Sequence, residues 1–166
     1  MDVVKLYRFA RWLRARGRTG MPEGLRLLGR VLHDIDLPAE ADIGPGLELG
    51  YGGLCVVVDP KARIGQDCFL SPGVTVGPLT PHGEAPVLGN CIYVGTGAKI
   101  LGPVRVGDYA IIGANAVVME DVPDGAIMAG VPAVELRRDP APEENYQRFL
   151  ASIRRQALPA TQALRR

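Results

Sequence analysis

Residues 88–113, LGNCIYVGTGAKILGPVRVGDYAIIG, repeat an aliphatic side chain at every sixth position. The same register runs from residue 43 to residue 118 in three blocks that are separated by short interruptions. Its twelve members are all Ile, Leu or Val: Ile43, Leu49, Val58, Ile64, Leu70, Val76, Leu88, Val94, Ile100, Val106, Ile112 and Val118. Gly directly follows eight of the twelve, and a small or apolar residue usually comes four positions after the aliphatic one.

A six-residue period fits neither an α-helix nor a long strand. It is typical of a chain in which a short strand turns one side chain inward before a tight corner, and Gly tolerates the positive φ that we expect at such corners. Three hexads would make one triangular coil of about 18 residues, and stacked coils would bury their aliphatic side chains against one another. The sequence therefore predicts a mainly β fold, a parallel β-solenoid.

The register breaks twice. Three extra residues stand between Leu49 and Val58, and we place them within residues 55–57. Further along, the segment 78–86, PLTPHGEAP, replaces a regular corner. Because it holds three prolines, a glycine and polar residues, we expect an excursion from the solenoid wall, where functional residues tend to lie on a rigid scaffold.

The segments on either side of the repeats are expected to be helical. An apolar stripe predicts a helix over residues 2–16, and Pro22 in a first turn indicates a second helix from 21 to 33. After two prolines at 140 and 142, we expect a helix from 143 to about 158. Its apolar stripe, which should dock on the solenoid, consists of Tyr146, Phe149, Leu150 and Ile153. The predicted organisation is an N-terminal helical segment (1–36), a β-solenoid domain (37–138) and a C-terminal helix (139–166).

The N-terminal segment is strongly basic. Residues 1–30 contain eight basic and two acidic side chains, a net charge of +6. One interpretation is a helix that contacts a membrane surface or an anionic partner. The other is a solvated face beside an oligomer contact, since a basic helix alone is a weak signal.

The overall composition limits the function classes. Lys and Arg number 19 and Asp and Glu 18, which excludes a globally basic nucleic-acid binder. No apolar run approaches the ~20 residues of a transmembrane helix, and the N-terminus lacks the pattern of a secretory signal. The three cysteines, Cys55, Cys68 and Cys91, have no CxxC spacing and favour neither a disulfide framework nor a zinc site. We therefore expect a cytoplasmic protein whose thiols are buried or half-buried.

The hexads and the segment Gly130-Val131-Pro132-Ala133 resemble the left-handed β-helix (hexapeptide-repeat) acyltransferases. Residues 38–138 are similar to the serine O-acetyltransferase branch of that group. The matching segments are 41–54 (ADIGPGLELGYGGL), 88–113 and 121–133 (DVPDGAIMAGVPA). The resemblance implies a left-handed parallel β-helix, acetyl-CoA or another acyl-CoA as co-substrate, no metal, a homotrimer, and active sites between adjacent solenoids.

By position, the resemblance also implies a path for the pantetheine arm of CoA and cations for its phosphates. The arm would run along Gly77, Gly95, Ala98, Ala114 and the turn Gly130–Pro132, because small side chains and backbone amides suit a narrow, amide-rich group. The implied phosphate contacts are Lys99, Arg137 and Arg138. Val134 stands where the family often has Arg, so the chain departs from the pattern there.

The acceptor side departs further from the family. Transfer to a hydroxyl needs a base, because a protonated alcohol is a poor nucleophile. The family supplies a His that an Asp just before it orients, and here that pair reads Gly50-Tyr51. A second family His aligns with Ala85. The chain has two histidines, His33 in the second predicted helix and His82 in the proline-rich excursion.

Three interpretations follow. In the first, His82 substitutes as the base, since the family places this loop over the acceptor site. In the second, Tyr51 hydrogen-bonds or positions the acceptor, because a phenol is a poor base at neutral pH and an amine acceptor would need a weaker one. In the third, the chain keeps the scaffold, has lost O-acetylation and acts as a binding or regulatory subunit.

Two other enzyme classes are disfavoured. A γ-class carbonic anhydrase, also a left-handed β-helix, needs three His ligands for its metal, and this chain has two histidines. A nucleotide-triphosphate enzyme is disfavoured because the GxxxxGK[ST] phosphate loop is missing. The sequence therefore predicts an acyl-CoA-dependent transferase that acylates a hydroxyl or amine of a small molecule, similar to serine acetyltransferase but with an altered acceptor site.

Overall fold

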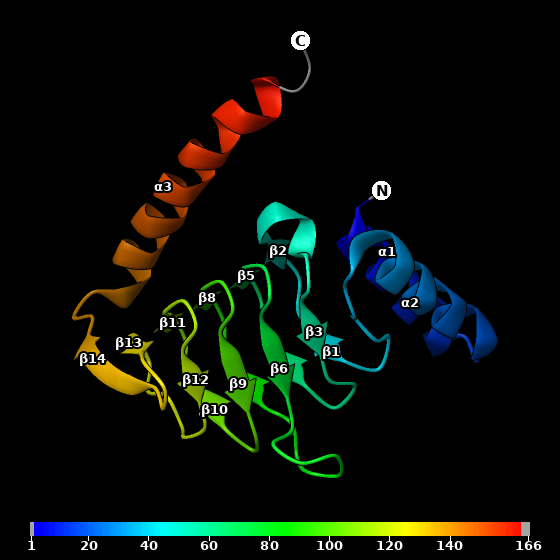
Figure 1. Cartoon of the computed structure of the whole chain (residues 1–166), viewed down its shortest axis with the longest axis horizontal. Coiled ribbons are helices and arrows are strands. Elements are labelled where there is room, and N and C mark those ends of the chain that lie inside the picture. Colours follow the sequence, from blue (N-terminus) through cyan, green and yellow to red (C-terminus); the bar gives the residue numbers. More distant parts are fainter. Residues whose placement is uncertain (1, 164–166) are drawn as a thin grey trace.

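A computed structural model of the chain describes residues 2–163, and side chains as far as residue 155. Two N-terminal helices, α1 (Val3–Ala15) and α2 (Gly20–His33), lead into a solenoid of short strands that is followed by α3 (Pro142–Ala163). Figure 1 shows α1 and α2 beside one end of the solenoid and α3 starting from the other end. The predicted class, a parallel β-solenoid flanked by helices, is confirmed.

The strands form three sheets, which are the three walls of the solenoid. The first wall holds β1 (Asp42–Ile43), β4 (Arg63–Ile64), β7 (Val87–Leu88) and β10 (Arg105–Val106). The second wall holds β2 (Glu48–Leu49), β5 (Phe69–Leu70), β8 (Tyr93–Val94), β11 (Ile111–Ile112), β13 (Ala126–Ala129) and β14 (Val134–Arg138). The third wall holds β3 (Val57–Val58), β6 (Thr75–Gly77), β9 (Lys99–Leu101) and β12 (Val117–Val118). Strands in these walls pair in parallel, except that β14 runs antiparallel to β13.

Three edges join the walls, and two of them matter for function. The corners after β2, β5, β8 and β11 turn the chain from the second wall to the third, and we call this line of corners the 2/3 edge. The segment after β13 stacks on the end of the same line, because the amide of Val117 donates to the carbonyl of Gly130. The corners after β3, β6 and β9 lead from the third wall to the first and form the 3/1 edge.

The six-residue register is confirmed as the core of the solenoid. Eleven of its twelve aliphatic side chains are buried, and Leu49 is partly buried against them. Val94 pairs with Ile112 and Leu88 pairs with Val106, so a regular coil is 18 residues long. Each coil therefore buries its inward side chains against the coils above and below it.

The expectation that the hexad glycines adopt positive φ is wrong. Positive φ occurs two residues further on, for example at Gly46, Gly97 and Asn115. The hexad glycine is required by close approach instead, since a Cβ atom on Gly65 would lie 2.3 Å from the carbonyl oxygen of Gly89 in the next coil. Five of the eight hexad glycines would bring a Cβ atom within 3.0 Å of the next coil, although Gly77 would not, and the turn itself depends on a different position.

The first interruption also lies elsewhere than predicted. Val57 pairs with Thr75 in the regular register and Val56 is buried, so residues 55–57 are not the insertion as a whole. The additional length is taken up before them, where the 3-10 helix η1 (Gly50–Gly53) bulges from the 2/3 edge. The second interruption is confirmed as an excursion, because residues 78–86 leave the wall between β6 and β7 (Figure 1).

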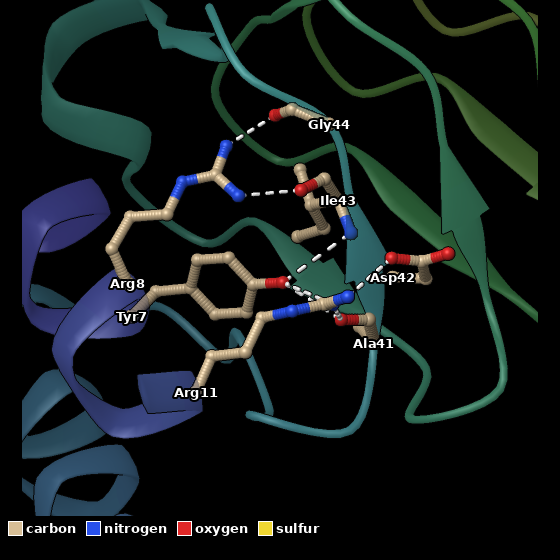
Figure 2. A network of polar contacts seen from close by, with 7 residues as sticks. All are labelled: Tyr7, Arg8, Arg11, Ala41, Asp42, Ile43 and Gly44. Carbon is tan, nitrogen blue, oxygen red and sulfur yellow. Dashed lines mark hydrogen bonds and ion pairs between the residues drawn. The ribbon is translucent and has the colours of Figure 1, made fainter. Parts of the chain in front are cut away.

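The basic side chains of α1 fasten this helix to the first coil (Figure 2). The contacting residues are Tyr7, Arg8 and Arg11 on α1 and Ala41, Asp42, Ile43 and Gly44 at β1. The Tyr7 hydroxyl donates to the Ala41 carbonyl at 2.7 Å and accepts from the Ile43 amide at 3.3 Å. Arg8 donates to the carbonyl oxygens of Ile43 and Gly44, and Arg11 donates to the Asp42 carboxylate at 2.5 Å. Neither interpretation of the basic N-terminus anticipated that these charges satisfy polar groups of the solenoid.

The apolar stripe of α3 docks on the second wall, as predicted. Tyr146 is 1% exposed, and its hydroxyl donates to the Asp67 carbonyl at 3.1 Å. The Phe149 ring lies edge-on to Tyr93, with 4.8 Å between the ring centroids. The helix begins one residue earlier than predicted, because proline suits a first turn, and it extends past the predicted end at 158.

The thiols follow the sequence expectation in part. Cys68 and Cys91 are buried, and burial raises the pKa of Cys68 to about 12. Cys55 is exposed, which corrects the expectation for that residue, because it follows η1 on the outside of the 2/3 edge. Over residues 2–163 no helix is long and apolar enough to cross a membrane.

Candidate functional site

Several residues expected to contact CoA lie along the 2/3 edge. Gly95, Ala114 and Gly130 occupy the successive corners after β8, β11 and β13. These corners touch, because a Cβ atom on Gly95 would lie 2.7 Å from the amide nitrogen of Ala114. Stacked coils lie about 4.8 Å apart, so the line from Gly95 to Gly130 spans roughly 10 Å. Ala114, Gly130 and Pro132 are exposed, whereas Gly95 is buried against the corner at Ala114, so the exposed strip of small residues runs from Ala114 to Pro132.

The 3-10 helix η1 lies on the same edge, two coils away from Gly95. Tyr51 has φ 49° and ψ 34°, a left-handed conformation that costs a residue with a side chain about 1–2 kcal/mol. A Cβ atom on Gly53 would lie 2.6 Å from Cδ1 of Ile35, so the chain passes there only as glycine. Tyr51 is 89% exposed, and its side chain projects from the 2/3 edge at η1.

A surface cavity of about 680 Å³ opens beside η1. The first turn of α1, His33 at the end of α2, the strand β2 and Gly52 of η1 line it. Its polar or charged side chains are Asp2, Lys5, His33 and Glu48. The Asp2 carboxylate caps α1 by accepting from the Val4 amide at 3.0 Å, which is why this helix begins at residue 3 and not at residue 2 as predicted. The Glu48 carboxylate is paired with Arg154 of α3.

The two residues proposed from the sequence as catalytic are not brought together within one chain. Tyr51 lies on the 2/3 edge, whereas His82 lies in the excursion that follows β6 on the 3/1 edge (Figure 1). His82 is exposed, and Gly77 stands at the same edge as His82. A site that uses both Tyr51 and the loop that carries His82 therefore needs two copies of the chain.

Two of the expected CoA contacts have other roles. Ala98 is 0% exposed in the solenoid core, which corrects its assignment, because the small residue of each hexad points inward. The Lys99 ammonium donates to the carbonyl of Gly73 at 2.6 Å and to that of Gly97 at 3.0 Å. Lys99 therefore ties two corners of the 2/3 edge together, and its contact with a CoA phosphate stays a prediction.

The two arginines expected at the CoA phosphates lie on β14, a strand that the sequence did not predict. β14 turns back from the segment at Gly130 and pairs antiparallel with β13. Arg137 is exposed, while Arg138 donates to Glu135 at 2.8 and 3.1 Å. Both arginines lie on the last coil of the solenoid, where they pair with Ile127 and Ala126 at the opposite end of β13 from Gly130.

Sequence reasoning missed the cavity beside η1. It placed His33 in a helix and gave it no role, because only the fold brings the last residue of α2 to β2 and Gly52. The one available signal was its rarity, since His33 is one of two histidines in the chain.

Comparison with known proteins agrees with the fold. No protein-family model matches the chain. A serine acetyltransferase of Helicobacter pylori is 38% identical over 135 residues, which cover 80% of this chain and 78% of that relative. The chain belongs to the serine acetyltransferase family. A family member from Mycobacterium tuberculosis is 35% identical over 128 residues, and the match covers 76% of this chain and 56% of that relative. This chain thus spans little more than half the length of some of the curated relatives it matches.

A solved structure of the family extends the comparison to a bound cofactor. The crystal structure of a serine acetyltransferase from Brucella abortus in complex with coenzyme A aligns with a TM-score of 0.75 at 30% identity. The alignment covers 81% of this chain and 54% of that one. The solenoid of this chain is therefore similar to one that holds CoA.

Proposed function

We propose that the chain is an acyl-CoA-dependent transferase that moves an acetyl group to a hydroxyl or amine of a small molecule. The observation that carries this proposal is the strip of small residues on the 2/3 edge, which leads toward η1 and its cavity. Such a strip suits a long, narrow arm, and a family relative is described as a CoA complex. Acetyl-CoA, or another acyl-CoA, is the proposed donor.

The proposed donor site follows the strip. The pantetheine arm runs past Ala114 to the turn Gly130–Pro132, where the exposed backbone is accessible to an amide-rich ligand, and the buried Gly95 lets the corner at Ala114 stack closely beneath it. Arg137 and Arg138 on β14 are proposed to meet the phosphates, since guanidinium groups pair well with phosphate oxygens. Lys99 is proposed to support the corners of the donor site, because it already donates to two backbone carbonyls.

A homotrimer is proposed to complete the site. Gly77 and His82 would reach the donor strip only if the 3/1 edge of one copy faced the 2/3 edge of the next, and a closed ring of copies provides this contact three times. Val131, Val134 and Leu136 support an interface, because all three are large apolar side chains exposed at the end of the strip.

The acceptor site is proposed to be non-standard. Gly50-Tyr51 stands where the family carries its Asp-His pair, so Tyr51 is assigned to positioning an acceptor at the mouth of the cavity. The cavity offers the carboxylates of Asp2 and Glu48 and the ammonium of Lys5. Groups of both signs suit a small hydroxy amino acid, and L-serine is the acceptor to test first.

The proposal is tested by an acetyl-transfer assay with acetyl-CoA and L-serine. We expect release of the CoA thiol that depends on L-serine, with O-acetylserine identified by mass spectrometry. A panel of small alcohols and primary amines extends the assay to other acceptors. Binding of CoA without transfer to any of them would instead favour the alternative function, a non-catalytic homologue that acts as a binding or regulatory subunit.

A further inference from the structure

We infer that His33, the last residue of α2, is the general base that accepts the proton of the acceptor hydroxyl. This inference rests on the proposed acyl transfer and names the group that replaces the family's missing histidine. It differs from the first of the three sequence-based interpretations, in which His82 is the base.

The position of His33 carries the inference. His33 lines the cavity of about 680 Å³ together with β2 and Gly52 of η1, and it is half-buried there. Gly52 directly follows Tyr51, which the resemblance aligns with the family's base. His33 thus borders the cavity from α2, beside this position of the coil.

The chemistry of the cavity wall leaves His33 as the fitting base. The Asp2 carboxylate is engaged as the cap of α1, and the Glu48 carboxylate is paired with Arg154. The Lys5 side chain is an ammonium group, which has donors and no acceptor site. Histidine is the side chain that most often performs general-base catalysis, and it is the one group of this wall suited to that task.

The end of α2 is also held firmly, which a catalytic side chain requires. Arg26 and Arg30 of α2 pair with Asp36, three residues beyond His33. Asp34 between them adopts φ 51°, and its amide donates to the Arg30 carbonyl at 3.2 Å to close the helix. The backbone at His33 is therefore held relative to the first coil by contacts on both sides.

The proposed step balances without a further reactant. The acceptor oxygen bonds to the carbonyl carbon of the thioester while His33 takes the hydroxyl proton. The carbon–sulfur bond then breaks, and the CoA thiolate leaves with the electron pair. His33 returns the proton to the sulfur, so the products are the acetyl ester and free CoA thiol.

The first test compares His33→Gln with Glu144→Gln, a change on the exposed outer face of α3, in the L-serine assay. Loss of a general base lowers kcat by at least about 100-fold. We expect this loss in His33→Gln, with CoA affinity by calorimetry within about twofold of the parent, a readout that unfolding would not preserve, and an unchanged kcat in Glu144→Gln. A His33→Gln variant that loses no more activity than Glu144→Gln would overturn the inference and leave the proposed function intact.

A second test does not depend on turnover. The chain has two histidines, so its imidazole NMR signals can be assigned with His33→Gln and His82→Gln. Adding L-serine to the CoA-bound protein should shift the His33 signals. A shift at His82 alone, or at neither residue, refutes the role of His33. Failure of the parent chain to bind CoA would remove the proposed function itself, which separates the two conclusions.

Discussion

Replacement of Asp36 by alanine is expected to lower the free energy of unfolding by about 3 kcal/mol. Asp36 is 9% exposed, and its carboxylate accepts from Arg26 at 2.6 and 3.0 Å and also pairs with Arg30. Without it, the largely buried Arg26 guanidinium has lost its counter-charge where α2 meets the solenoid. Urea unfolding at neutral pH measures the change.

The matched control for Asp36→Ala is an exposed ion pair. Glu144→Ala breaks the pair between Glu144 and Arg148 on the outside of α3, and such surface pairs contribute about 0–1 kcal/mol. If Asp36→Ala were no more destabilising than Glu144→Ala, the ion pairs of Asp36 would not be what holds α2 in place.

The same carboxylate makes stability depend on acidic pH. Burial by itself would raise the pKa of Asp36, but hydrogen bonds from Arg26 and Arg30 outweigh it and hold the pKa below its ordinary value of 3.8. The unfolded chain therefore binds this proton more tightly than the folded one. The stabilisation is complete above pH 3.8 and is lost as the pH falls through the folded-state pKa. Asp36→Asn should lose less stability than the parent on acidification, and equal losses would contradict this assignment.

Replacement of Gly65 by alanine is expected to cost about 3 kcal/mol, the upper end of the usual range for overpacking. A Cβ atom there would lie 2.3 Å from the Gly89 carbonyl oxygen and 2.6 Å from the Asn90 side chain. Because the first of these atoms is backbone, two coils must separate to admit the methyl group. Thermal or urea unfolding of the variant measures the cost.

Gly77→Ala is the control for Gly65→Ala. Both glycines follow an aliphatic residue of the register, but the first atom met at Gly77 is Cβ of Asp59 at an ordinary 3.6 Å. We expect Gly77→Ala to change stability little. Similar losses at the two positions would mean that the requirement for glycine comes from the corner conformation and not from the spacing of the coils.

The buried interior of the fold can be predicted from the sequence because its side chains recur with a fixed period. A side chain such as Ile100 recurs every sixth residue for one reason, burial between coils, and that reason acts at each coil alike. The conformation of the corners cannot be predicted in the same way. Gly65 must be glycine because the backbone of another coil lies against it. The bulge at η1 depends on which residues accept a left-handed conformation. Periodicity shows that length has been added but not where.

The candidate site can be predicted from the sequence only in part. Gly95 and Ala114 could be placed because they belong to the repeat, and their neighbours in space follow from its period. His33, Glu48 and Arg154 meet through the packing of α2, β2 and α3, for which no short sequence pattern exists. Ala98 was misassigned for a related reason, since a motif does not say which face of the wall a small residue occupies.

The central claim, that the 2/3 edge holds the arm of CoA, is tested most directly by calorimetric titration of CoA into three proteins. The parent chain should bind with micromolar affinity. Ala114→Tyr places a ring on the exposed strip and should weaken binding at least about tenfold, or roughly 1.4 kcal/mol. Gln66→Tyr adds the same ring at an exposed corner between the first and second walls and should leave affinity unchanged. No binding by the parent chain, or equal affinity in all three proteins, would contradict the account.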